Sequence, residues 1–201
     1  ETAAWDVVFD DRGHFTEPHT GRSIGLGTLA VRQYTGLWRQ DIDDMVDPEL
    51  TFDIGTHGPA NRYRYALFIE KEGFAPLLKS AQIAERYDLA IFSTKGLPVT
   101  ASRQLAERLA EQGVTILVLH DFDKAGFSIL HTLSHDNRRY RYRTRPRVID
   151  LGLRLADVQG LGLESERVEY KDKADPAINL ARNGAKPDEL RYLVKGRQWS
   201  A

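Results

Sequence analysis

Residues 114–126 read Val-Thr-Ile-Leu-Val-Leu-His-Asp-Phe-Asp-Lys-Ala-Gly, and this stretch decides the fold. The apolar run over 114–119 is typical of a buried strand, and Asp121 and Asp123 stand where that strand should end. Residues 125–133 then form a predicted helix. A buried strand that leads through a polar turn into a helix is half of a βαβ unit, so the stretch predicts a parallel sheet.

Two similar units precede this stretch and a further strand follows it. The apolar run at 65–69 leads into helical spacing over 73–87, and the run at 89–92 leads into a predicted helix over 98–112 that stops at Gly113. A fourth strand is predicted at 147–151. The repetition predicts an α/β fold in which helices cover both faces of a parallel sheet.

The two flanks differ from this centre. Residues 1–60 are rich in Gly, Thr, Asp and His, which indicates a loop-rich, partly β preface. At the other end, Asp175 and Pro176 predict a helix start, and a second helix is predicted from Pro187 to Lys195. We therefore divide the chain into a preface (1–60), an α/β domain (61–165) and a C-terminal helical extension (166–201).

Composition excludes several classes of protein. Hydrophobic residues make up 41% of the 201 residues and charged residues 28%, as in an ordinary globular protein. No run approaches the ~18 apolar residues of a membrane helix. The absence of cysteine excludes disulfides and thiolate metal sites and predicts a cytoplasmic protein. Because the chain starts at Glu1 without methionine, we expect a fragment of something longer.

Three acids follow predicted strands. Glu70 comes directly after the strand at 65–69, and Asp121 and Asp123 follow the strand at 114–119. Ligands of parallel sheets collect at the carboxyl ends of strands, and carboxylates suit Mg²⁺. An Asp-x-Asp turn is also typical of a plain helix cap. The pairing with Glu70 and the glycine at 126, which lets the helix start close by, favour a magnesium site.

Taken together, these motifs resemble a known family. Glu70-Lys71, the turn Ser93-Thr94-Lys95-Gly96-Leu97-Pro98 followed by Arg103, and Asp121-Phe122-Asp123-Lys124-Ala125-Gly126 are similar to the Toprim domain of topoisomerase VI A subunits, which meiotic relatives share. The resemblance covers roughly residues 60–165, and the joint occurrence of the motifs is more specific than any one of them. It implies a Toprim-like α/β fold, type IIB topoisomerase chemistry and DNA as a partner.

The resemblance also implies roles for residues. Glu70, Asp121 and Asp123 would bind Mg²⁺, Glu70 would act as general acid or base, and Lys95 and Arg103 would hold a phosphate. Glu72 competes with Glu70 for the role of Mg²⁺ ligand but is better explained as the start of a helix.

One departure from the family leaves the reaction type open. The family's tyrosine sits on a winged-helix domain that does not fit into residues 1–60, and Tyr34, Tyr63 and Tyr65 are not nominated. Either a tyrosine domain precedes this chain, or the protein hydrolyses DNA with activated water. A non-catalytic DNA-binding module is the alternative. The resemblance also implies a homodimer and an ATPase partner subunit as possible partners.

A run of arginines follows the predicted helix at 125–133. Residues 138–147 hold six arginines and no acid. If the segment is extended, Arg139, Arg141, Arg143 and Arg145 point to one face and could follow the phosphates of DNA. The alternative is a segment kept soluble by its charge. His131 and His135, four residues apart, are better explained as a helix surface than as a zinc site.

Overall fold

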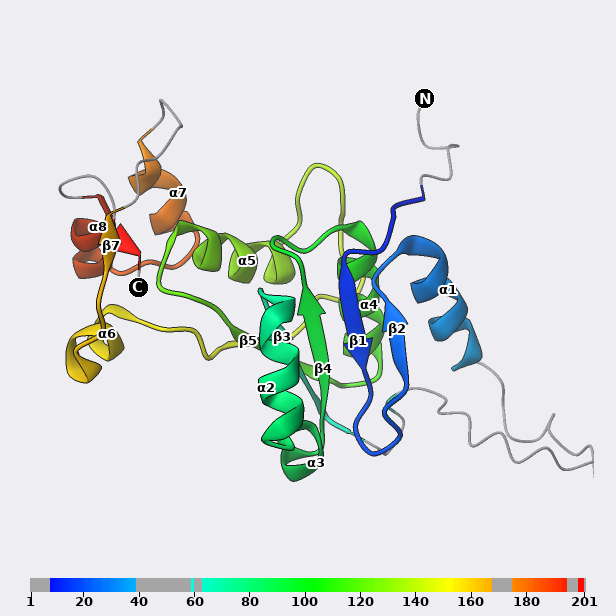
Figure 1. Cartoon of the computed structure of the whole chain (residues 1–201). Coiled ribbons are helices and arrows are strands. Elements are labelled where there is room, and N and C mark those ends of the chain that lie inside the picture. Colours follow the sequence, from blue (N-terminus) through cyan, green and yellow to red (C-terminus); the bar gives the residue numbers. More distant parts are fainter. Residues whose placement is uncertain (1–7, 39–58, 60–62, 168–174, 195–198, 201) are drawn as a thin grey trace, which may run out of the picture.

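The computed structural model describes residues 8–38, 59, 63–167, 175–194 and 199–200. Its main sheet has the strand order β2-β1-β4-β3-β5-β6 (Figure 1). These strands are β1 (Gly13–Thr16), β2 (Ser23–Gly25), β3 (Tyr65–Ile69), β4 (Leu89–Thr94), β5 (Thr115–Leu119) and β6 (Val148–Asp150). The four strands β3 to β6 run parallel, whereas β1 and β2 are antiparallel to their neighbours. The predicted α/β fold with a mainly parallel sheet is confirmed.

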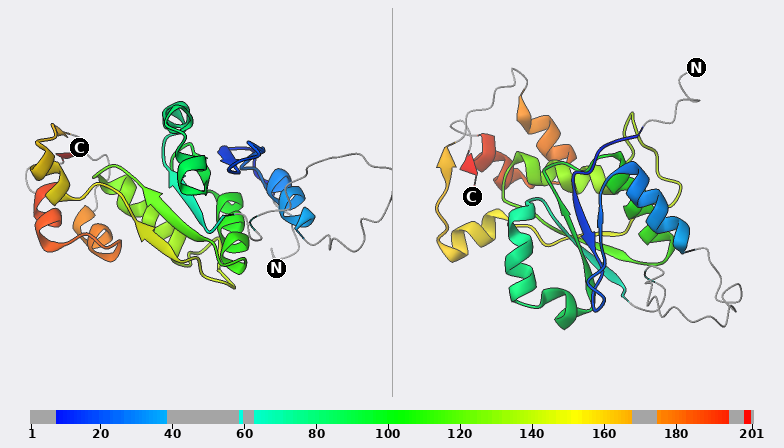
Figure 2. Two further views of the ribbon diagram at one scale, coloured as in Figure 1. Left: turned by 90° about the horizontal axis from the view of Figure 1, so that it is seen from below. Right: turned by 45° about the vertical axis from the view of Figure 1, so that its right-hand side comes forward.

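Helices cover both faces of this sheet (Figure 2). On one face lie α1 (Thr28–Leu37), α4 (Thr100–Glu111) and α5 (Lys124–Ser134). Their apolar sides pack against alternate strand residues such as Phe15, Phe68 and Phe92, and this is the larger core cluster. On the other face lie α2 (Ala75–Ser80) and α3 (Ile83–Tyr87), over a smaller cluster.

The helix predicted over 73–87 is wrong in one respect, because the chain breaks in its middle. A 3₁₀ turn, η2 (Glu72–Phe74), leads into α2, and Gln82 has a left-handed φ of 52° before α3 begins. Leu78 and Ile83 both pack against the sheet. Five residues apart on one straight helix, they would point about 140° away from each other. The break therefore lets both side chains reach the sheet.

The amino-terminal segment joins the main sheet. β1 pairs with β4, so that Phe15 lies opposite Phe92, and β2 closes the hairpin. Helix α1 was not predicted; it buries Val31 and Tyr34 in the main core. Residues 1–7, 39–58 and 60–62 of the predicted preface lie outside the described residues. The three-part division of the chain stays a prediction.

The predicted C-terminal helices are present as α7 (Pro176–Arg182) and α8 (Pro187–Val194). A further helix that was not predicted, α6 (Leu155–Leu161), precedes them. They pack around Phe122 and Phe127 in a second cluster beside the sheet (Figure 1). A short pair, β7 (Glu166–Arg167) with β8 (Trp199–Ser200), completes this region. Within the ranges described, no helix has the length and apolarity needed to cross a membrane.

Candidate functional site

The register of the sheet brings the three predicted acids to one edge. Ile69 of β3 lies opposite Leu119 of β5, so Glu70 and the turn that carries Asp121 and Asp123 leave neighbouring strands at the same level. Neighbouring strands are about 4.8 Å apart. The carboxyl ends of β3 and β5 therefore gather these acids, as the strand-end argument predicted.

Glu70 is the least satisfied of the three acids. Its Oε2 is buried and has no hydrogen-bond partner among the described residues. Burial and the nearby charges of Asp123 and Asp121 raise the pKa of Glu70 above its ordinary value. A hollow of about 260 Å³ lies beside it, with a mainly apolar lining that includes Phe74, Leu119 and Leu153.

The other two acids already have partners. The ammonium of Lys71 binds a carboxylate oxygen of Asp121. Asp123 is the N-cap of α5, because its Oδ1 accepts the backbone N–H of Gly126 at 2.7 Å. The helix-cap interpretation of the Asp-x-Asp turn thus holds for Asp123, although a cap uses only one of its two oxygens.

The three acids are candidate ligands for a divalent cation. Within the described part of the chain, no three His, Asp or Glu side chains converge as they stand on a point that could hold a metal ion. The donor chemistry nevertheless fits, because oxygen ligands suit Mg²⁺ and because the charges of Asp121 and Asp123 still raise the pKa of Glu70 although Lys71 lowers it. The unpartnered Oε2 of Glu70 is the atom that a cation would satisfy.

Lys95 lies at this edge, as predicted. The N–H of Gly96 donates to the backbone oxygen of Glu70 at 3.1 Å, which ties the turn after β4 to the end of β3. Lys95 Nζ lies 3.2 Å from a carboxylate oxygen of Glu72, and that carboxylate also binds the ring of His14 from β1. These bonds hold Glu72 toward β1. His14 was missed, because nothing in the sequence indicates that β1 pairs with β4.

A buried histidine, whose role sequence reasoning left unresolved, supports the acidic turn. His120 Nδ1 donates to the backbone oxygen of Asp121 at 2.7 Å, and Nε2 donates to Asp150 at 3.1 Å. Burial alone would lower the pKa of His120, but these two bonds outweigh it and raise the pKa. A Cβ on Gly126 or Gly152 would lie 2.3 Å from the ring. The ring is therefore enclosed on two sides.

The network continues into the C-terminal region. Arg154 donates to Asp150 at 2.7 Å and binds both carboxylate oxygens of the buried Glu189 in α8, at 2.6 and 2.8 Å. Asp150 ends β6, so the strand-end rule that identified the other acids could have identified it too. The partners Arg154 and Glu189 carry no comparable signal in the sequence.

The structure contradicts the predicted position of Arg103. Its side chain is 1% exposed, with the guanidinium 4.8 and 5.1 Å from the ring centroids of Tyr142 and Tyr140. Arg103 also donates to the backbone oxygen of His135 at 2.6 Å. It is thus a structural cation between α4 and the arginine run, and not an exposed group at the acidic edge.

The extended segment that we considered for residues 139–147 does not form. Asn137 and Asp136 accept the backbone N–H groups of Arg139, Tyr140 and Tyr142, and Glu107 accepts those of Arg143 and Thr144. Side chains thus take the hydrogen bonds that a neighbouring strand would otherwise provide. The segment is a loop whose six arginines are all exposed while both tyrosines turn inward. The arginines face out and the tyrosines face in, as considered for an extended segment, although no strand forms.

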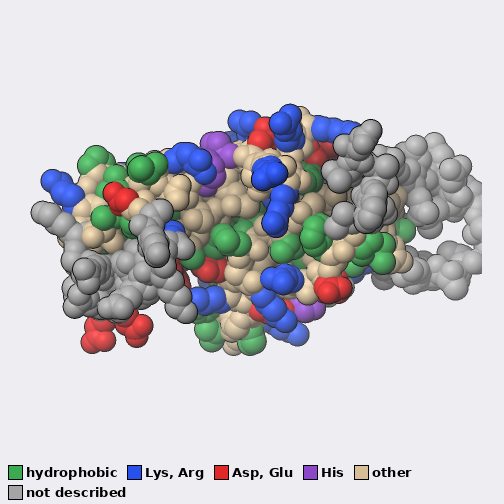
Figure 3. All heavy atoms as spheres, turned by 90° about the horizontal axis from the view of Figure 1, so that it is seen from above, with side chains coloured by type: hydrophobic (Ala, Val, Ile, Leu, Met, Phe, Trp, Pro, Cys, Tyr) green, Lys and Arg blue, Asp and Glu red, His purple; other side chains and the backbone are tan. Residues whose placement is uncertain are grey.

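Cationic side chains gather on one face of the molecule. Figure 3 shows Lys and Arg side chains across the middle of the face seen from above, with His beside them.

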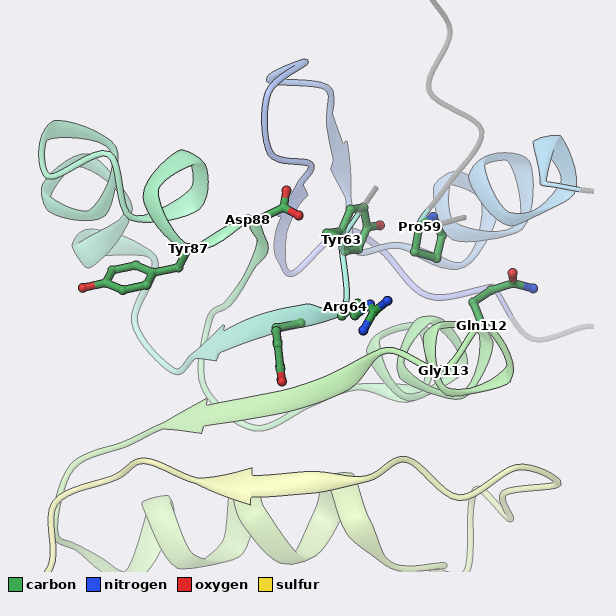
Figure 4. A pocket seen from close by; sticks show the side chains of 8 residues that line it. Pro59, Tyr63, Arg64, Tyr87, Asp88, Gln112 and Gly113 are labelled. Carbon is green, nitrogen blue, oxygen red and sulfur yellow. The ribbon is translucent and has the colours of Figure 1, made fainter. Parts of the chain in front are cut away.

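A second hollow lies at the amino end of β3, opposite the end that carries Glu70. It has a volume of about 500 Å³ and is lined by Tyr63, Arg64 and Tyr87 among others (Figure 4). Its one acidic lining residue, Asp88, lies 2.7 Å from His19. This second hollow lacks the gathered acids of the first.

Comparison with protein families gives a match. The family model for the Toprim domain shared by topoisomerase 6 A subunits and Spo11 matches residues 65–193. The matched range is well over half of the chain. It includes the acidic edge, the loop over residues 138–147, which we call the arginine loop, and helices α6 and α7. No curated protein matches the chain.

We expect Asp150→Asn to destabilise the protein at neutral pH. Burial would raise the pKa of Asp150, but hydrogen bonds from His120, Gly152 and Arg154 lower it to about 2. The stabilisation, about 2 kcal/mol, is present above pH ~4 and is lost as the pH falls through ~2. Urea unfolding at several pH values should therefore show a difference from wild type that narrows between pH 4 and 2. A pH-independent difference, or one equal to that of the exposed Asp10→Asn, would contradict this role.

The enclosure of His120 predicts the effect of a single methyl group. We expect Gly152→Ala to lower the free energy of unfolding by about 1–3 kcal/mol, because its Cβ would overlap the ring of His120. Gly160→Ala, inside α6, is the matched control, since its Cβ would meet no atom within 4 Å. That change should be neutral or stabilising. Equal stability of the two variants in thermal or urea unfolding would show that the ring has room to move.

Proposed function

Because this chain belongs to the family of Toprim domains found in topoisomerase 6 A subunits and Spo11, we propose that it takes part in Mg²⁺-dependent cleavage of the phosphodiester backbone of DNA. Glu70, Asp121 and Asp123 are the proposed metal-binding and catalytic residues. The observation that carries the proposal is the buried, unpartnered Oε2 of Glu70 beside the two aspartates. An arrangement that leaves like charges close together is typical of functional sites and costs stability in a purely structural edge.

Each acid has a proposed role. A divalent cation held by these carboxylates would stabilise the charge that develops on the phosphodiester oxygens. Glu70 is the proposed general acid or base, because burial and the neighbouring acids raise the pKa of its carboxyl group above the ordinary value. Asp123 keeps α5 and the turn in place through its cap while offering its second oxygen. Lys71 balances the charge of Asp121.

The proposed DNA contacts are exposed cations. Lys95, whose side chain is 64% exposed, flanks the acids, and Arg139, Arg141, Arg143 and Arg145 extend the positive surface. Arginine suits bidentate contact with phosphates. Arg103 is not proposed as a contact, because it is buried. An ATPase partner subunit is proposed from the family alone, and so is a homodimer.

We propose none of Tyr34, Tyr63 and Tyr65 as the nucleophile. Tyr34 and Tyr63 are 2% and 3% exposed and share a hydrogen bond of 3.3 Å. Burial and the neighbouring Tyr63 and Glu17 raise the pKa of Tyr34 far above its ordinary value. Tyr65 opens β3, at the opposite end of the strand from Glu70. Attack by a tyrosine of another domain and attack by water both remain compatible with the acidic edge.

We expect Asp121→Ala and Asp123→Ala each to reduce Mg²⁺-dependent nicking of supercoiled plasmid at least ~100-fold, since several kcal/mol of charge stabilisation are lost. Asp121→Ala should leave the fold in place. Asp123→Ala should also lower stability by ~1 kcal/mol through the lost cap.

Glu70→Gln should retain part of the metal binding, measured with Mn²⁺ by calorimetry, while losing turnover. The exposed Glu85→Gln is the control. Unchanged nicking in both aspartate variants would overturn the metal assignment. DNA binding without any nicking by the intact protein, including any further domain that carries the nucleophile, would favour a non-catalytic module.

The arginine loop should reveal itself through salt dependence. Replacing Arg141, Arg143 and Arg145 together by Gln should weaken binding to all duplex sequences alike. It should also lower the magnitude of the slope of log affinity against log salt by about 2–3, at ~0.9 per lost phosphate contact. Fluorescence titrations of a labelled duplex at several salt concentrations measure this slope, with Arg86→Gln on α3 as control. Identical slopes would mean that the loop arginines only keep the surface soluble.

A further inference from the structure

A site lined by cationic side chains lies at the carboxyl end of α5, whereas the acids lie at its amino end. A hollow of about 570 Å³ opens there, which we call the α5 hollow. Its charged and titratable lining residues are His131, His135, Asp136, Arg138, Arg145 and Arg182. They come from the end of α5 with the arginine loop that follows it and from α7, so two stretches that are distant in sequence converge on one opening.

The charge in this hollow is positive and largely uncompensated. Three arginines face one carboxylate, which leaves a net charge of +2 before either imidazole gains a proton. Asp136 is already engaged, because it accepts the N–H of Tyr142 at 3.0 Å and lies 3.4 Å from Arg145. For Arg138 and Arg182, no ion pair with a described residue is present.

The two histidines are held as a pair. The rings of His131 and His135 are stacked, with centroids 4.3 Å apart and an angle of 14° between planes. Burial lowers the pKa of His131, and so do the nearby His135, Arg182 and Arg103. Like-charged neighbours thus oppose its protonation. A bound anion would reverse this part of the shift and make the ring a further donor at mildly acidic pH.

The loop side of the hollow is fixed. Arg103 is buried against Tyr140 and Tyr142 and donates to the backbone oxygen of His135, which ties the loop to the end of α5. Glu107 binds the loop from α4 through Tyr140 and Thr144. A site whose walls are held in this way loses little conformational entropy when it binds a ligand.

We propose that the α5 hollow binds a phosphate group, and that this group belongs to the DNA backbone. Guanidinium groups match the oxygens of phosphate in geometry and charge. The DNA assignment rests on the proposed function. Helix α5 has 11 residues and is therefore about 16 Å long, at 1.5 Å per residue. For a duplex whose axis runs along α5, phosphates of one strand advance about 3.4 Å each, so the hollow would take a phosphate about five nucleotides from the one at the acidic edge.

The first test uses inorganic phosphate as the probe. We expect phosphate to shift the ring-proton NMR signals of His131 and His135 in a saturable way and to raise the pKa of His131 on titration. Binding should therefore weaken as the pH rises through the pKa of His131. The double variant Arg138→Gln with Arg182→Gln should abolish the shift, whereas Arg86→Gln should not. Absence of a saturable shift in wild type would overturn the proposal.

The second test uses a labelled 20-base-pair duplex in EDTA, where no cleavage can take place. In the double variant, the magnitude of the slope of log affinity against log salt should be smaller by about 1, for one lost phosphate contact. Phosphate binding with an unchanged salt slope would overturn the DNA assignment in favour of a free anion.

These outcomes are separate from those of the proposed function. Asp121→Ala should lose nicking while keeping the phosphate-induced shifts and the wild-type salt slope in EDTA. If wild type never nicks DNA but the double variant still lowers the slope, the proposed cleavage fails and the α5 hollow stands.

Discussion

The ring of His120 is the constraint on which the acidic edge depends. It fills the space between Gly126 and Gly152 so closely that neither position admits a Cβ, and it donates on one side to the Asp121 backbone and on the other to Asp150. The turn after β5, the start of α5 and the end of β6 are thereby fixed against one another. Through Arg154 and Glu189 the same chain of charges reaches α8. The acids are therefore held by groups well removed from the surface that they present.

Much of this edge could be predicted because it follows local rules. Apolar runs identify the strands, and polar residues after parallel strands meet at one edge, so Glu70, Asp121, Asp123 and Lys95 were placed together correctly. Arg103 could not be placed in this way. Its burial depends on Tyr142 and on the backbone of His135, which lie 39 and 32 residues away in sequence. A cation is stable inside a protein only with such partners, and single-sequence patterns do not reveal them.

Similar reasoning explains the other misses. Pairing of β1 with β4 joins residues about 80 apart, and it alone brings His14 to the edge. The arginine run has the period of a strand, yet Asn137, Asp136 and Glu107 take its backbone N–H groups. Period two reports which side chains face inward, and it does not report what satisfies the backbone.

The arginine loop has a consequence for how such a surface can evolve. The loop is fixed by its inward tyrosines, by Arg103 and by side chains that accept its backbone N–H groups, whereas the side chains of its arginines are exposed. Of these arginines, Arg145 contacts Asp136 at 3.4 Å. Substitutions at the outward positions are therefore close to neutral for folding. Selection can add, remove or shift positive charges along this rim one at a time, and so retune the affinity for a polyanion without first having to rebuild the scaffold beneath it.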